Sequence, residues 1–220
     1  MRPDKTFNRL GMERFVPLAL QIFFAGTALV WRAWYQRRKF GITGVVLFRG
    51  DRAQHVRDAG LVLLVLVLGA QGVGCAFTPE RFAGRCFSGA WTHPAVFWTG
   101  AALVLVASIL MVVAQLHLGR SWRIGIDEHA RPGLVTSGFF RFCRNPIFAF
   151  LLLGLIGFQL LLPTWLSTVA LVAGYAGIAR QVAAEEAWLK RAYGDAYLEY
   201  SGRVGRFLPW IGRLRQARPF

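Results

Sequence analysis

Two short groups of residues carry side chains suited to binding a charged ligand. The first is GFFRFCRNP, residues 138–146, in which Arg144 precedes a proline at the expected start of an apolar helix. Backbone N–H groups and the positive dipole end at such a helix start favour a carboxylate, and so does Arg144. The second is the pair Glu185-Glu186, whose carboxylates suit an ammonium, a sulfonium or ribose hydroxyls. Each group alone is typical of ordinary structure, and their combination is more specific.

The elements that must position these residues are membrane helices. The 220 residues are 55% hydrophobic and carry a formal net charge of +15, and the mean hydropathy is +0.42. A nucleic-acid-binding protein can carry such a charge, but it does not also contain several long uncharged segments. We therefore expect a single-domain, all-α integral membrane helix bundle, surrounded by membrane lipid and with its arginines in the loops.

Apolar segments predict about five transmembrane helices. Three of them are residues 15–35, 61–77 and 94–118, and residues 146–179 form an uncharged hairpin that breaks at Leu162-Pro163-Thr164 because proline resists helix continuation. Each hairpin arm has about 16 residues, or ~24 Å, against a hydrocarbon core of ~30 Å. We therefore expect the hairpin tip to end short of the far headgroups and to need neighbouring helices around it.

The distribution of basic residues predicts the orientation. Five spans place the termini on opposite sides, and 20 of the 26 Lys and Arg residues fall on the C-terminal side. Because cytoplasmic loops carry such an excess, the C-terminus and the site are predicted to be cytoplasmic, in a bacterial-type inner membrane. Within one structural domain, residues 1–115 would form the N-terminal membrane helices and a basic connector. Residues 116–220 would form the core that contains the loop, the hairpin and a C-terminal cytoplasmic helix.

The segment after the last span is amphipathic rather than apolar. Its apolar residues recur at helical spacing between Val182 and Tyr200. Gly194-Asp195 is typical of a helix stop followed by a new N-cap. Farther on, Phe207, Leu208 and Trp210 are apolar enough to return the tail to the membrane surface.

The order of these motifs resembles that of the isoprenylcysteine carboxyl methyltransferase family and, equally, of the related phospholipid methyltransferases. The resemblance covers about residues 116–212. It departs at Asn145, where the family has a histidine, because an amide can form hydrogen bonds but does not titrate near neutral pH. The matching motifs are Val135-Thr136-Ser137-Gly138, Arg144-Asn145-Pro146, a hairpin of about forty residues, Glu185-Glu186, Tyr197-x-x-Tyr200 and Arg203-Val204-x-x-Phe207-Leu208-Pro209.

The resemblance implies an S-adenosylmethionine-dependent methyltransferase whose cofactor lies in a cytoplasmic pocket under the loop. Arg144 would orient a carboxylate or thiolate acceptor, and Glu186 would take the proton from an amine acceptor. Arg123 and Arg203 are candidate substrate-binding residues, and the scattered His and Cys residues predict no metal site. The cofactor-binding residues implied are Val135, Gly138, Phe140, Arg144, Asn145, Pro146, Glu185 and Glu186.

The acceptor remains open at this point. A lipophilic molecule that enters from the bilayer is expected, such as the carboxylate of a prenylcysteine-like molecule, a lipid, a quinone-like molecule or a small thiol. The alternative function is a non-catalytic membrane scaffold or lipid-binding protein of the same fold, which would not bind the cofactor. A small transporter ranks lowest, because the four later spans carry no formal charge.

Overall fold

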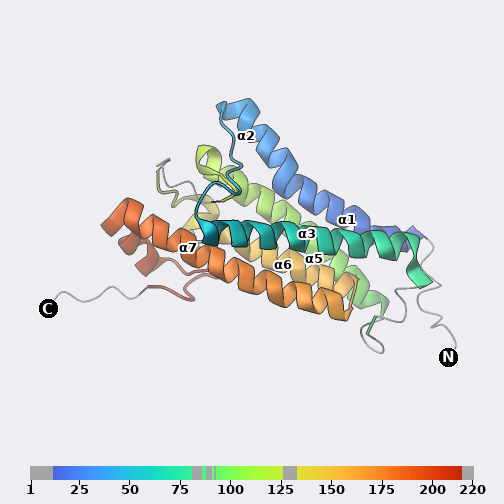
Figure 1. Cartoon of the computed structure of the whole chain (residues 1–220). Helices are drawn as coiled ribbons and strands as arrows, with labels where there is room; N and C mark the ends of the chain where they lie inside the picture. The colour runs from blue at the N-terminus through green and yellow to red at the C-terminus, as the bar shows by residue number, and fades with distance from the viewer. Residues whose placement is uncertain (1–11, 81–85, 88–90, 92, 126–132, 215–220) are drawn as a thin grey trace.

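The computed structural model describes residues 12–80, 86–87, 91, 93–125 and 133–214. Long helices lie side by side in it as a bundle (Figure 1), which confirms the all-α prediction. The helices are α1, Val16–Ala25, which continues through a π-helical segment, Gly26–Trp31, into α2, Arg32–Phe40; α3, Arg52–Phe77; α5, Pro94–Leu118; α6, Pro146–Leu161; and α7, Trp165–Arg203.

The helices close into a ring. α1 packs on α3, α3 on α7, α7 on α6, α6 on α5, and α5 on α1. Within the described residues, four helical segments are long and apolar enough to cross a membrane, and α6 is a shorter apolar helix. These elements are consistent with the five predicted spans, and the start of α1 and the end of α7 lie at opposite ends of the bundle (Figure 1).

Two of the predicted spans are longer than expected. The first helical segment extends to Phe40 rather than to residue 35, and it ends where Gly41 adopts a positive φ of 69°. α3 begins at Arg52 rather than at residue 61, because the Asp51 side chain accepts a hydrogen bond of 2.7 Å from the Gln54 N–H and so caps the helix. Its first turns are polar, so they extend the helix beyond its apolar part.

The hairpin breaks where the proline predicted. α6 ends at Leu161 and α7 begins at Trp165. Gln71 of α3 donates hydrogen bonds of 2.7 Å to the hydroxyls of Thr164 and Ser167 at the tip. The tip of this short hairpin is therefore held by a neighbouring helix, as expected from its length.

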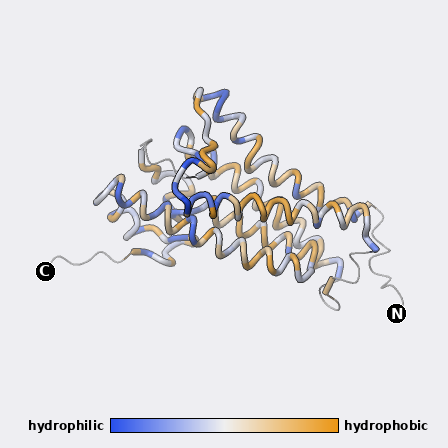
Figure 2. Tube along the Cα trace, in the orientation of Figure 1, coloured by the Kyte–Doolittle hydropathy of each residue, from blue (hydrophilic) through white to orange (hydrophobic). Residues whose placement is uncertain are grey.

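α7 changes direction inside its 39 residues. Gly194 has a non-helical backbone conformation, with φ 51° and ψ −126°, so the predicted stop and restart at this position is confirmed. Figure 2 shows apolar residues along the middle of the bundle and hydrophilic residues gathered at one end, which holds the start of α3 and the later part of α7. The two predicted motifs, residues 138–146 and Glu185-Glu186, lie at this polar end.

Candidate active site

The loop that precedes α6 has a fixed shape. Gly138 begins a 3₁₀ turn, Gly138–Arg141, with φ +60°. A Cβ at Gly138 would lie 2.5 Å from Cγ of His117, so a larger residue would collide with that ring as well as strain the backbone. Pro146 starts α6, as proline at a helix start predicts. Gly138 therefore shapes the loop, and its predicted contact with the cofactor stays a prediction.

The C-terminal segment pairs with this loop. The Arg144 N–H donates to the Gly205 carbonyl at 2.8 Å, and the Asn145 N–H donates to the Arg206 carbonyl at 3.1 Å. The Tyr200 hydroxyl donates to the Phe140 carbonyl at 2.6 Å. Two backbone N–H groups at the start of α6 thus donate to carbonyls of the protein itself. They are not available to bind the carboxylate that the sequence led us to expect at this helix start.

A buried ion pair joins the two predicted motifs. Arg144 Nε donates to Glu186 Oε1 at 3.1 Å, and Asn145 Nδ2 donates to the same oxygen at 2.9 Å. Arg206 completes the cluster through a 3.0 Å ion pair with Glu186 Oε2. The predicted proximity of the arginine-asparagine-proline turn to the glutamate pair is therefore present in the structure. We call this group, Arg144, Asn145, Glu186 and Arg206, the clamp.

The guanidinium of Arg144 also binds the segment that follows α7. It donates to the carbonyls of Ser201 and Val204 at 3.1 and 2.6 Å, and to that of Gly212 at 3.2 Å. Arg144 and Glu186 are both buried. With these contacts, the arginine binds three backbone carbonyls and one carboxylate, which is the geometry of a positioning residue for the C-terminal segment.

Glu185 is oriented differently from its neighbour. Gln181 Nε2, one turn earlier on α7, donates to Glu185 Oε1 at 2.8 Å, and Arg57 Nε of α3 donates to Gln181 Oε1 at 2.9 Å. Glu185 lines a cavity of about 150 Å³ at the polar end of the bundle, whereas Glu186 does not. One glutamate thus faces the cavity and the other faces the clamp, because adjacent helix positions point in different directions.

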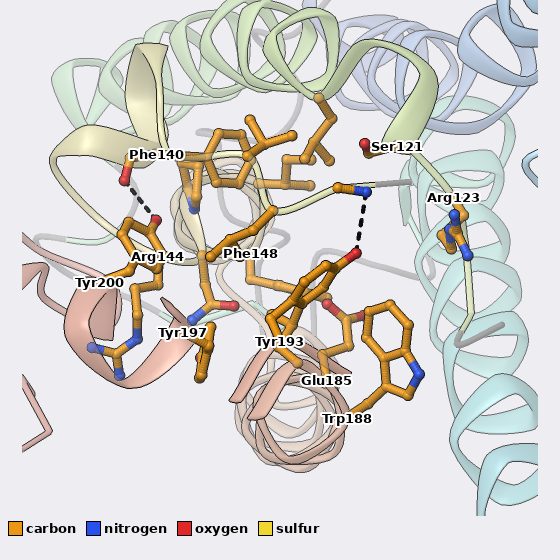
Figure 3. Close-up of a pocket in the computed structure, with 18 of the residues that line it drawn as sticks. Ser121, Arg123, Phe140, Arg144, Phe148, Glu185, Trp188, Tyr193, Tyr197 and Tyr200 are labelled. Carbon is orange, nitrogen blue, oxygen red and sulfur yellow. Dashed lines mark hydrogen bonds between the residues drawn. The ribbon is translucent and has the colours of Figure 1, made fainter. Parts of the chain in front are cut away.

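Aromatic side chains make up much of the cavity wall. Figure 3 shows Trp188 next to Glu185, and the Tyr193 hydroxyl accepts a 3.2 Å hydrogen bond from the Gly133 N–H across the cavity. The sequence reasoning did not assign Trp188 or Phe148 to the site. Glu185, Trp188 and Leu189 are spaced for one face of α7. This spacing could have predicted that Trp188 lies beside Glu185. The aromatic residues of the wall are Phe140, Phe148, Trp188, Tyr193, Tyr197 and Tyr200.

The structure places the predicted site residues in three groups. Arg203 lies away from the cavity, where it is exposed and pairs with Glu199 at 3.5 Å. Gly138 and Glu186 are not among the lining residues, and Glu186 accepts a hydrogen bond from Arg144, which does line the cavity. The predicted residues that line the cavity are Arg123, Val135, Phe140, Arg144, Asn145, Pro146 and Glu185.

Comparison with known proteins now bears on this arrangement. Residues 95–196 match the family model described as phospholipid methyltransferase. The chain is 32% identical to protein-S-isoprenylcysteine O-methyltransferase A of Arabidopsis thaliana, over 57% of this chain and 65% of that protein. It is 30% identical to the B protein of the same plant, over 51% of this chain and 58% of that protein. The chain therefore spans less than two thirds of the length of these curated relatives.

A solved structure supports the fold. The eukaryotic intramembrane Ras methyltransferase ICMT, isoprenylcysteine carboxyl methyltransferase, is 17% identical and superposes with a TM-score of 0.50 over 90% of this chain and 99% of that chain. The match to the phospholipid methyltransferase family model is a similarity of residues 95–196, which are just under half of the chain. The resemblance seen in the sequence is thereby confirmed, and the integral membrane character of the chain agrees with it.

The similarity to phospholipid methyltransferases gives weight to Asn145, where the resemblance seen in the sequence expects a histidine. Asn145 uses its amide nitrogen to donate to Glu186 Oε1 at 2.9 Å and to the Arg206 carbonyl at 3.2 Å. Both bonds belong to the clamp. Asn145 is therefore a neutral double donor that joins α6, α7 and the C-terminal segment.

Proposed function

We propose that this protein transfers a methyl group from S-adenosylmethionine to a lipophilic acceptor in the membrane. The observation that carries the proposal is the aromatic cavity with Glu185 in its wall, located within the family region at the polar end of an apolar bundle. S-adenosylmethionine, when bound, supplies a methyl group already activated on a sulfonium. The protein must therefore bind a cation, align the acceptor and exclude water.

The donor set of the cavity fits such a ligand. The Glu185 carboxylate suits the ammonium or the ribose hydroxyls of the cofactor, and it is held in place through Gln181. The faces of Trp188, Tyr193 and Tyr197 suit an adenine ring or a sulfonium, because aromatic faces attract cations. Each of these residues binds or orients the ligand, and none of them needs to change its covalent state.

The clamp has a positioning role in this proposal. Arg144 and Glu186 draw the C-terminal segment against the cavity through buried contacts, and this segment helps to exclude water. The prediction that the two residues act directly on the acceptor remains a prediction. Arg123 lines the cavity wall and is our candidate to hold an acceptor carboxylate.

The acceptor we propose is the carboxylate of a prenylcysteine-like molecule, with a lipid or a small thiol as further members of the same lipophilic class. The names of the relatives, protein-S-isoprenylcysteine O-methyltransferases, support a carboxylate on a prenylated cysteine. The excess of Lys and Arg on the C-terminal side supports a cytoplasmic cavity.

Titration of the purified protein in lipid nanodiscs with S-adenosylmethionine and with its demethylated product tests the first half of the proposal. We expect saturable heat for both ligands and weaker binding by Glu185→Gln. Transfer of a labelled methyl group to a synthetic farnesylcysteine tests the second half. Absence of binding in the intact, folded protein would instead favour the scaffold or lipid-binding alternative.

A further inference from the structure

The chain after α7 forms a small apolar hairpin outside the cavity. The Arg206 N–H donates to the Ile211 carbonyl at 2.7 Å, and the Ile211 N–H donates to the Leu208 carbonyl at 3.3 Å. The Leu214 N–H then returns to the Ser201 carbonyl at 3.1 Å. We call residues 204–214 the C-terminal hairpin. Backbone hydrogen bonds at its base and tip give it a defined shape.

The tip of the C-terminal hairpin presents large apolar side chains to its surroundings. Leu208, Trp210 and Ile211 are 56%, 73% and 65% exposed. Trp210 also has a positive φ of 64°, which is unfavourable for a bulky residue. A strained backbone that turns an indole outward is not explained by packing within the chain.

The hydrogen bonds to the loop fix the depth of this hairpin relative to the bundle. The Asn145 N–H donates to the Arg206 carbonyl at 3.1 Å, and the uncharged helix α6 starts at the next residue, Pro146. The C-terminal hairpin therefore leaves the bundle at the level where the uncharged helix α6 begins. In Figure 1 the red segment after α7 turns back beside the bundle rather than away from it.

Charge at the same level fits lipid headgroups. Phe142, in the loop that pairs with the hairpin, is also exposed, and the Arg141 guanidinium lies 5.2 Å from its ring centroid. Arg213 follows the tip and is exposed. Tryptophan with leucine and isoleucine beside exposed arginines is the composition of a segment that lies in the membrane interface.

We propose that the C-terminal hairpin is an interfacial anchor that inserts Leu208, Trp210 and Ile211 among the lipids beside α6. The anchor is coupled to the cavity, because Arg144 donates to the carbonyls of Val204 and Gly212 at the two ends of the hairpin. Lipid that retains the tip thereby keeps the hairpin bound to Arg144 and next to the cavity. This coupling rests on the proposed function, whereas the insertion itself does not.

Insertion is tested with a fluorophore on Ile211→Cys in nanodiscs, using lipids with a quencher near the headgroup and iodide in the water. Val172→Cys is the lipid-exposed reference on the apolar part of α7, and Lys190→Cys is the water-exposed reference on its polar part. Signal from the native cysteines is subtracted with the unsubstituted protein. We expect the label at 211 to be quenched by lipid and shielded from iodide, as at 172. Iodide quenching equal to that at 190 overturns the anchor, and it would also be the result if the tip faces a soluble protein partner.

Coupling is tested by S-adenosylmethionine titration of Trp210→Ser in nanodiscs. Trp34→Ser is the matched control, because Trp34 is also exposed but lies on α2, outside the hairpin. We expect several-fold weaker binding only for Trp210→Ser, because the fraction of molecules in which the hairpin stays bound to Arg144 falls. Equal affinity of the two variants overturns the coupling. Absence of binding in the unsubstituted protein instead refutes the proposed function, while the quenching experiment still decides whether the anchor exists.

Discussion

The two adjacent glutamates allow a sharp test, because Glu185 lines the cavity whereas Glu186 belongs to the clamp. Replacing each by glutamine keeps the shape and removes the charge. At Glu186 the change takes the counter-charge from Arg144, which is buried, and from Arg206, which is partly exposed. At Glu185 it leaves the clamp intact and alters only the hydrogen-bonded side chain that lines the cavity.

The contacts set the magnitudes. Removing one partner of a buried ion pair costs ~3–5 kcal/mol, and the exposed partner adds only ~0–1 kcal/mol. Glutamine retains an acceptor oxygen, so we expect a loss near ~3 kcal/mol for Glu186→Gln, or ~6–12 °C in Tm for a protein of this size. For Glu185→Gln we expect a lost charge-assisted bond to the ligand of ~1.5–3 kcal/mol, or ~10–100-fold weaker binding, with Tm little changed.

Both variants are measured in the same nanodiscs, by thermal unfolding without ligand and by calorimetric titration with S-adenosylmethionine. The expected pattern is a large fall in Tm for Glu186→Gln and a large fall in affinity at nearly constant Tm for Glu185→Gln. The opposite pattern, with Glu185→Gln less stable and still binding normally, would refute the assignment of clamp and cavity roles.

Three further outcomes follow from single contacts. Arg57→Met removes the 2.9 Å bond that orients Gln181, so S-adenosylmethionine should bind about two- to tenfold more weakly, and unchanged affinity beside an Arg52→Met control would contradict the relay. Burial raises the pKa of the Cys143 thiol to about 11, so maleimide should modify it slowly at pH 7.5 and much faster after unfolding; rapid labelling of the folded protein would show that the loop is open. Gly138→Ala combines a positive φ with a Cβ only 2.5 Å from a histidine ring, so Tm should fall by ~2–12 °C, and a stable variant would show that the loop relaxes.

Helix ends were predictable where one residue decides the backbone. Pro163 separates α6 from α7 within the uncharged run, and Gly194 interrupts α7, because proline lacks an N–H and glycine accepts a positive φ. The start of α3 was predicted nine residues too late because hydropathy marks only the apolar part of a helix. Asp51 and Gln54 are spaced as a capping box and carried the missing signal.

Most of the predicted site residues line one cavity, but the separate contacts of each residue could not be predicted from the sequence. Which of Glu185 and Glu186 faces the cavity depends on the rotation of α7 about its axis relative to α6, and adjacent carboxylates look alike in a sequence. Besides Glu186, the partners of the Arg144 guanidinium are the backbone carbonyls of residues 201, 204 and 212. Carbonyls carry no side-chain signature, so only the path of the folded C-terminal hairpin shows that the arginine is held by the protein.

The asparagine that replaces the family's histidine narrows the chemistry. A histidine donating two bonds here would need both ring nitrogens protonated, which would add a positive charge beside Arg144 and Arg206. Asn145 gives two N–H bonds from one neutral nitrogen, to Glu186 and to the Arg206 carbonyl. The asparagine thereby takes part in the clamp without a group that titrates near neutral pH. An amine acceptor must lose a proton during methylation, whereas a carboxylate or thiolate has none to lose, so the anionic acceptor that we propose needs no titrating base at position 145.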